Sequence, residues 1–237
     1  MAQHISRKEL KKDEVRETLA HGAEAVLSHQ QFVLFLAIGV ILAAAGFYGW
    51  RAYTTRQTMK ASMTFDAAMK VFQTPVGTLP APGETSYATD PAKFTAAEGM
   101  FSGLAAKYPR TRAGHLARYY AALCDEKLGK PDDAKKWLDG LLASRDVYVA
   151  GLAKFELAAL DDRTGQDAEA VKLYEELIAK PPVLVPKAVV MLALADHYRQ
   201  KDPSKAAQLY GQIKSEYPDT PIAEQASRSL SLLPGQS

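Results

Sequence analysis

The sequence predicts an all-α protein in which a single N-terminal transmembrane helix is followed by a solenoid of paired helices. Residues 32–50, FVLFLAIGVILAAAGFYGW, form a run of 19 residues without a charge. Beyond this run, stretches with helical patterning alternate with short turns rich in proline and glycine, and no alternating strand pattern occurs. One pattern of residue types also recurs at intervals of 36 or 37 positions, which is typical of a helical repeat array.

Composition narrows the classes of function. The 237 residues are 47% hydrophobic and 24% charged, as in ordinary folded proteins. A net charge of +2 gives no strong attraction to polyanions, so we expect no nucleic-acid partner. The one cysteine, Cys124, cannot form an internal disulfide or a multi-thiolate metal site. It falls in an alanine-rich helical stretch and is expected to pack as a small apolar group.

Residues 32–50 are predicted to cross a membrane, after a short charged tail over residues 1–31. As a helix the run is roughly 28 Å long, close to the ~30 Å hydrocarbon core. Phe47, Tyr48 and Trp50 stand at its far end, where aromatic side chains favour the membrane interface. A cleaved signal peptide is the alternative, because residues 43–45 are three alanines. The apolar run continues past them, which favours an uncleaved anchor over a signal peptide or a buried core helix.

The orientation of this anchor stays open on charge alone. More basic residues follow the span closely than precede it closely, which would keep the C-terminal part in the cytoplasm. That rule is weak for long translocated domains.

Gly39, Ala43 and Gly46 lie on one face of the helix, and small residues at this spacing let a second transmembrane helix approach closely. They are the predicted packing face.

Residues 51–237 are predicted to form the repeat domain. Its first helix covers about residues 56–72, and residues 74–91, TPVGTLPAPGETSYATDP, are a loop insertion. Later breaks are predicted at 108–109, 129–131, 164–165, 181–186, 201–203 and 217–218. A closing helix over about 222–232 would cover the apolar face of the last pair.

The repeated pattern has a small residue, a bulky residue four positions later, an aliphatic residue three further on, and then a helix stop. Its four copies are Ala97, Phe101, Leu104, Pro109; Ala134, Leu138, Leu141, Asp146; Ala170, Tyr174, Leu177, Pro182; and Ala206, Tyr210, Ile213, Pro218. Positions i, i+4 and i+7 share one helix face. The alanine lets the partner helix come close, and the stop ends the second helix of the pair. The twin turns YPRT (108–111) and YPDT (217–220) are two such stops.

This spacing resembles tetratricopeptide repeats, which are helix–turn–helix units of about 34 residues. Ala122 and Ala158 occupy the small position expected in the first helices, whereas the third unit has Leu194. In that fold the first helices line the concave face. The resemblance therefore implies a partner-binding groove formed by Tyr119, Lys127, Phe155, Arg163, Met191, Tyr198 and Arg199.

Lys127, Arg163 and Arg199 are 36 residues apart, and two interpretations of this series are open. They can serve as favourable cations at helix C-termini. They can also form a basic stripe that receives an acidic or C-terminal carboxylate group.

The residues predict a non-enzymatic protein without cofactor, metal or small-molecule substrate. The sequence has no glycine-rich phosphate loop, HExxH motif or serine nucleophile elbow. The five histidines lack ligand spacing, and His115 and His197 are expected to be surface or groove residues. Asp161 and Asp162 beside Arg163 are expected to form a solvated charge cluster.

The layout resembles the YfgM-like ancillary subunits of the bacterial SecYEG translocon. The resemblance rests on DEVRETL (13–19), GWRAY (49–53) and TRQTMKASMTFDAAM (55–69). It implies a cytoplasmic tail, one inner-membrane helix and a periplasmic tetratricopeptide-like domain related to that of the cell division coordinator CpoB. The implied function is a scaffold at the Sec channel that contacts periplasmic chaperones or translocating chains. The alternatives are a general envelope scaffold for division or outer-membrane assembly, and a cytoplasm-facing regulatory repeat protein.

Overall fold

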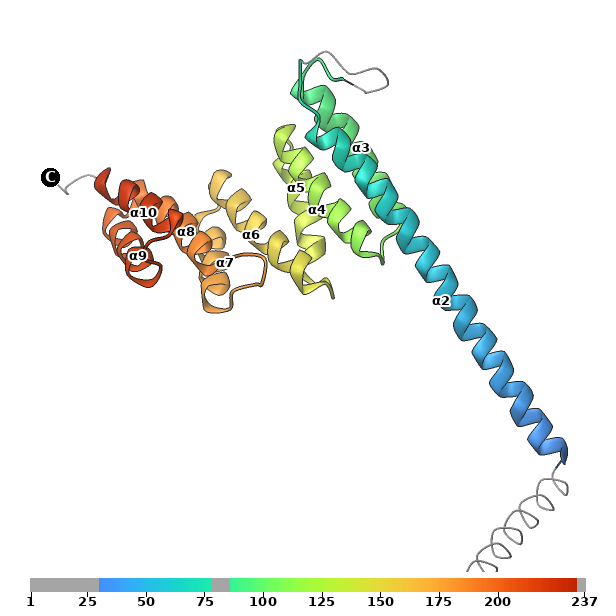
Figure 1. Cartoon of the computed structure of the whole chain (residues 1–237). Coiled ribbons are helices and arrows are strands. Elements are labelled where there is room, and N and C mark those ends of the chain that lie inside the picture. Colours follow the sequence, from blue (N-terminus) through green and yellow to red (C-terminus); the bar gives the residue numbers. More distant parts are fainter. Residues whose placement is uncertain (1–29, 78–85, 234–237) are drawn as a thin grey trace, which may run out of the picture. The chain divides into compact units, whose positions relative to one another are not determined.

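The structure, a computed structural model, describes residues 30–77 and 86–233, and over these ranges it is helical with no strand beyond one isolated bridge (Figure 1). The helices are α2 (Gln30–Gln73), α3 (Asp90–Lys107), α4 (Arg112–Lys127), α5 (Pro131–Leu142), α6 (Val147–Arg163), α7 (Asp167–Ala179), α8 (Lys187–Lys201), α9 (Pro203–Glu216) and α10 (Pro221–Ser231). The predicted all-α class and the predicted breaks between helices are confirmed. Most of the predicted tail, and residues 78–85 of the predicted loop, lie outside the described residues.

The chain divides into two compact units, Met1–Arg56 and Gln57–Ser237. The sequence pattern suggested separate helices over residues 32–50 and 56–72, but α2 runs through both without a break. The connecting residues 51–55, RAYTT, contain no proline or glycine that would end a helix. The Thr54 hydroxyl donates a hydrogen bond to the Arg51 carbonyl within the same helix, at 2.9 Å.

In the described part of the first unit, α2 is a helix that is both long enough and apolar enough to span a membrane. Its large apolar side chains are exposed; Phe32 and Phe35, for example, are 67% and 70% exposed. A Cβ atom added at Gly39 or Gly46 would meet no other atom within 4 Å. The packing face of Gly39, Ala43 and Gly46 therefore stays a prediction about a partner outside this chain.

The second unit is a row of helix pairs. Its first helices are residues 57–73 of α2, then α4, α6 and α8, and its second helices are α3, α5, α7 and α9. Each helix from α3 onward packs on the next one along the chain, and α10 covers α8 and α9 as the predicted closing helix. Successive pairs also touch through their first helices, α4 with α6 and α6 with α8. In the described part of the chain α5, α7 and α9 do not touch one another, so the first helices lie on the inner side of the row.

The repeated residues form the core, as the spacing predicted. Ala97, Ala134, Ala170 and Ala206 are all 0% exposed. The bulky residues that follow four positions later, Phe101, Leu138, Tyr174 and Tyr210, are at most 2% exposed. Each alanine lets a neighbouring helix approach, and the bulky side chain fills the adjoining space. Close packing of this kind explains why the four residue types recur together.

The twin turns share one hydrogen-bonding arrangement. Thr111 caps α4: its hydroxyl accepts from the Gly114 N–H at 3.0 Å and donates to the Tyr108 carbonyl at 3.0 Å. Thr220 caps α10 in the same way, accepting from Ala223 N–H and donating to the Tyr217 carbonyl. In each case the threonine hydroxyl accepts from an N–H in the first turn of the following helix and donates to the C-cap carbonyl of the preceding helix. The turn that follows the second helix of a pair therefore has the same Tyr-Pro-x-Thr pattern and the same hydrogen bonds at both places.

Candidate protein-interaction surface

The first helices α4, α6 and α8 present a common surface on the inner side of the row, which we call the inner face. Three of the predicted groove residues, Tyr119, Phe155 and Tyr198, come from these helices, one from each, and all three are half-buried. Tyr119 packs against the core between α4 and α6, and Phe155 and Tyr198 pack against the core between α6 and α8. Each ring is thus held by the core and only partly exposed, and the Lys205 ammonium from α9 lies 4.9 Å from the centre of the Tyr198 ring. Rings held in this way suit recognition, because little conformational entropy is lost on binding.

Met191 is a different case. It is 1% exposed and packs with Leu192, Ala195 and Tyr210 in the core of the last pair. The predicted groove residue is therefore a core residue with no surface to offer. The spacing placed it correctly at the position equivalent to Phe155, but the closing helix α10 and α9 complete a tighter core around it.

The predicted basic series stands at the ends of the first helices, with Lys127, Arg163 and Arg199 each in the last turn. Lys127 and Arg199 are exposed. Arg163 forms ion pairs with Glu126 on α4 and with Glu156 on its own helix. Because its charge is neutralised by these two carboxylates, the three residues do not make a continuous basic stripe.

Between α4 and α6, Arg163 is grouped with two glutamates and a tyrosine: Glu126, Glu156 and Tyr119. The side chains of Glu126 and Glu156 are only 15% and 18% exposed. Burial and the Glu156 charge raise the pKa of Glu126 to about 7, although Arg163 acts in the opposite direction. Burial and Glu156 also raise the pKa of the Tyr119 hydroxyl well above its usual value, so it stays protonated and hydrogen-bonds to Glu156. The charge of the inner face consequently changes near neutral pH.

The raised pKa of Glu126 predicts a pH-dependent effect of Glu126→Gln. The folded state binds this proton more tightly than the unfolded chain, whose carboxyl has an ordinary pKa of 4.5. The stability from Glu126 is therefore present below pH 4.5 and lost as pH rises through about 7. We expect Glu126→Gln to raise the urea midpoint at pH 8 and to change it little at pH 5. Glu175→Gln, at an exposed site on α7, is the control with the same charge change; equal shifts for both variants at pH 8 would contradict this prediction.

Buried polar residues form a second series with the same period. Asp125, Asp161 and His197 are 36 apart and are 3%, 2% and 7% exposed. Asp125 accepts a hydrogen bond from the Trp137 indole N–H at 3.1 Å, and Lys135 donates to Asp161 at 2.5 Å. The expectation of a solvated cluster at Asp161 was wrong, because Lys135 comes from the preceding pair and satisfies this carboxylate inside the interface.

His197 is likewise buried, not a surface residue, and its Nδ1 lies 2.6 Å from Asp162 Oδ1. Asp162, Asp167 and His197 bring their ligand atoms within 4.8 Å of one another, a spacing that a metal ion could use. The Lys201 ammonium already lies 2.5 Å from Asp167 and 3.8 Å from Asp162. This cation neutralises the carboxylates, so the cluster is best explained as an ion-pair network between successive pairs.

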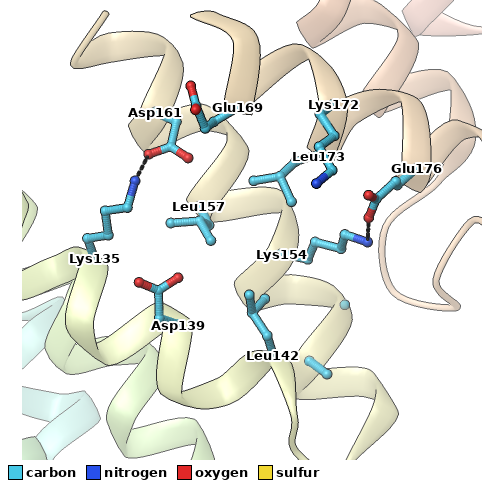
Figure 2. A pocket seen from close by; sticks show the side chains of 12 residues that line it. Lys135, Asp139, Leu142, Lys154, Leu157, Asp161, Glu169, Lys172, Leu173 and Glu176 are labelled. Atoms are coloured by element: carbon cyan, nitrogen blue, oxygen red, sulfur yellow. Dashed lines mark hydrogen bonds and ion pairs between the residues drawn. The ribbon is translucent and has the colours of Figure 1, made fainter. Parts of the chain in front are cut away.

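A cavity of about 500 Å³ lies between α5 and α7 and over α6 (Figure 2). Lys135–Asp161 and Lys154–Glu176 bridge its walls, and Leu142, Leu157 and Leu173 form apolar parts of the lining. The first ion pair joins α5 to α6 and the second joins α6 to α7, as Figure 2 shows. Among the residues that line this cavity there is no serine, cysteine or histidine, so it holds no Ser–His or Cys–His pair.

Cys124 is fully buried in the core of the first two pairs, as expected from its alanine-rich helix. Burial raises the pKa of its thiol to about 12. The thiol therefore stays protonated and acts as a small apolar group.

Comparison with known proteins agrees with the packing. The tetratricopeptide repeat-like domain family matches residues 28–181, and a tetratricopeptide repeat matches residues 188–220. The chain belongs to the tetratricopeptide repeat-like domain family. Repeats of this architecture stack helix pairs into extended concave surfaces that bind other proteins, so the coarse function is that of a protein-interaction scaffold.

Solved structures show the same fold. A crystal structure of nearly identical TPR-like repeats, described as a kinesin light chain candidate from Podosopora anserina, is similar with a TM-score of 0.55. The two chains are 15% identical, and the similarity covers 73% of this chain and 84% of that one. A crystal structure of a single-substitution variant of the same protein is similar to the same degree. No curated protein sequence matches the chain.

Proposed function

We propose that this protein is a membrane-anchored interaction scaffold, an ancillary subunit of the bacterial Sec translocon. Its repeat domain contacts chaperones or translocating chains in the periplasm, and α2 holds it at the inner membrane. The observation that carries the proposal is the inner face, which combines half-buried rings with charged groups. The sequence resemblance over residues 13–19 and 49–69 supports the choice of the translocon.

The contact residues we propose on the inner face are Tyr119, Phe155, Tyr198, Lys127 and Arg199. The three rings would provide apolar contacts, and the two exposed cations would bind acidic groups at the rim. Arg163 would contribute mainly by holding Glu126 and Glu156 in place. A surface with rings fixed by the core and flexible charges around them suits partners of varied sequence.

The membrane part of the proposal rests on the exposed apolar length of α2 and its small-residue face. Exposed rings and aliphatic chains on a long helix are stable in lipid and costly in water. Gly39, Ala43 and Gly46 would let a transmembrane helix of a translocon subunit pack closely. Residues 1–31 would then form a short cytoplasmic tail.

Affinity capture of the full chain in mild detergent tests the partner. We expect Sec translocon subunits or a membrane-anchored chaperone to be recovered. Gly39→Leu with Gly46→Leu should reduce this recovery, whereas Ala37→Leu with Ala44→Leu, which has the same spacing on the opposite side of the helix, should not. Recovery of division or outer-membrane assembly proteins alone, with the bait intact, would contradict the translocon assignment.

Protease treatment of spheroplasts tests the orientation. A periplasmic repeat domain is digested in intact spheroplasts, and we expect this result. A domain that stays protected until the membrane is opened would instead face the cytoplasm and would support a regulatory role there.

A further inference from the structure

A second cavity, of about 580 Å³, lies at the end of the α4–α5 pair and is lined by basic side chains without an acidic one. We call it the arginine pocket. Its walls come from the turn before α4, the first turns of α4, the end of α5 and the loop that leads to α6. The lining residues are Pro109, Arg110, His115, Arg118, Gly140, Leu141, Ala143, Ser144 and Arg145. The neighbouring cavity over α6, by contrast, is lined by lysines together with four carboxylates.

The three guanidinium groups are available for a ligand. Within the described part of the chain no carboxylate forms an ion pair with Arg110, Arg118 or Arg145. The nearest acidic residue in sequence, Asp146, caps α6 through Tyr148 and Val149 N–H groups and pairs with Arg112. Three like charges converging on one hollow repel one another, and an anion bound there would relieve that repulsion.

Two polar residues of the pocket wall, His115 and Ser144, are held in place by hydrogen bonds. Ser144 Oγ lies 3.1 Å from His115 Nδ1 and accepts from the Asp146 N–H at 3.2 Å. If the serine hydrogen points to Nδ1, the Nε2–H of His115 is left as a further donor. This pair ties the loop before α6 to α4, so two walls of the pocket are held in register before any ligand binds.

We propose that the arginine pocket binds an acidic peptide segment of a partner protein, a proposal that rests on the scaffold function given above. Guanidinium groups bind carboxylates through paired N–H donors. The volume is within the range of sites that enclose more than a single small ion, and exposed Pro109 and Ala143 supply apolar wall. A segment with two or more carboxylates on a peptide backbone fits both features.

Gly140 provides a way to close the pocket without changing its charge. It lines the pocket on α5, and a Cβ atom added there would meet no other atom within 4 Å. A phenylalanine at this position would extend into the hollow. Because glycine is a poor helix former, the substitution should not destabilise α5.

The test uses the full chain in nanodiscs of a zwitterionic lipid and a labelled hexaglutamate peptide, with hexaglutamine as the uncharged peptide. We expect hexaglutamate to bind and hexaglutamine not to bind. Arg118→Gln with Arg145→Gln should weaken hexaglutamate about 10-fold or more, since two charge-assisted contacts are lost. Gly140→Phe should weaken it as well. Lys180→Gln with Lys214→Gln, two exposed sites elsewhere, removes the same charge and should change binding less than about twofold.

Three results would overturn the proposal: no binding of hexaglutamate at low salt, equal weakening by the arginine and lysine pairs, or binding that survives both Arg118→Gln/Arg145→Gln and Gly140→Phe. Inorganic phosphate or phosphatidylglycerol vesicles that bind in a Gly140-dependent way, while hexaglutamate does not, would assign the pocket to phosphate instead. Captured partners that persist when hexaglutamate fails to bind would leave the scaffold function standing. Loss of capture with hexaglutamate binding intact would contradict the scaffold function alone.

Discussion

Replacing Leu138 with alanine is expected to lower the free energy of unfolding by about 2–5 kcal/mol, because the deleted atoms leave a cavity in a fully packed core. Leu138 lies on α5 and is 0% exposed. It belongs to the same core as Ala122 on α4, Leu141 on α5 and Val149 on α6. The change removes the bulky member of the repeated pattern in one copy. It should therefore loosen two neighbouring interfaces of the row at once.

Leu142→Ala is the matched control for this prediction. Leu142 lies one turn further along α5 and is 40% exposed, so the same atoms are removed with less burial lost. Urea unfolding followed by far-UV circular dichroism gives both midpoints. An equal loss of stability at Leu142 and Leu138 would contradict the burial of Leu138 in the core.

Replacing Ala170 with leucine is expected to destabilise the protein by about 1–3 kcal/mol or more through overpacking. Ala170 is 0% exposed on α7 and faces the core that contains Ala158, Tyr174 and Val190. A larger side chain would push α7 from its neighbours, because the small residue is what permits their approach. Alanine and leucine have similar helix propensities, so the effect reports packing and not helix formation.

Ala168→Leu separates these two causes. Ala168 lies on the same helix and is exposed, so the added atoms have room. We expect its unfolding midpoint to stay near that of the unsubstituted chain. If Ala168→Leu and Ala170→Leu had the same midpoint, the close approach of helices at the repeated alanines would be contradicted.

The fold could be predicted from the sequence because its determinants are periodic. Ala134, Ala170 and Ala206 recur every 36 residues, and the stops at Pro182 and Pro218 recur with the same period. Each signal is weak alone, but together they specify which face of which helix is buried. The unbroken course of α2 was harder to foresee, since a change from apolar to charged residues at Arg51 does not by itself end a helix.

The electrostatics of the surface could not be predicted in the same way, because the partners lie in different repeats. Arg163 pairs with Glu126, 37 residues earlier, and Lys135 reaches Asp161, 26 residues later. Which of these distant groups meet depends on how far one pair is rotated on the next. Asp125, Asp161 and His197 are 36 residues apart, but no pattern in the sequence indicated that these polar residues are buried.

The arginine pocket has no sequence signal for a similar reason. Arg110, Arg118 and Arg145 come from a turn, a helix and a loop, and no common spacing relates them. They converge because α4 begins, and α5 ends, at the same end of an antiparallel pair. Glu126 was also missed, since its raised pKa depends on burial against α6 and on the charge of Glu156.

Site-specific photocrosslinking in living cells tests the central claim, that partner proteins bind the inner face. A benzophenone amino acid would replace Phe155 or Tyr198 on the inner face, and Glu175 or Gln212 at exposed sites on α7 and α9. We predict crosslinks to other proteins from the first two positions and none from the second two. Crosslinks that arise only from Glu175 and Gln212, or equally from all four positions, would contradict the account.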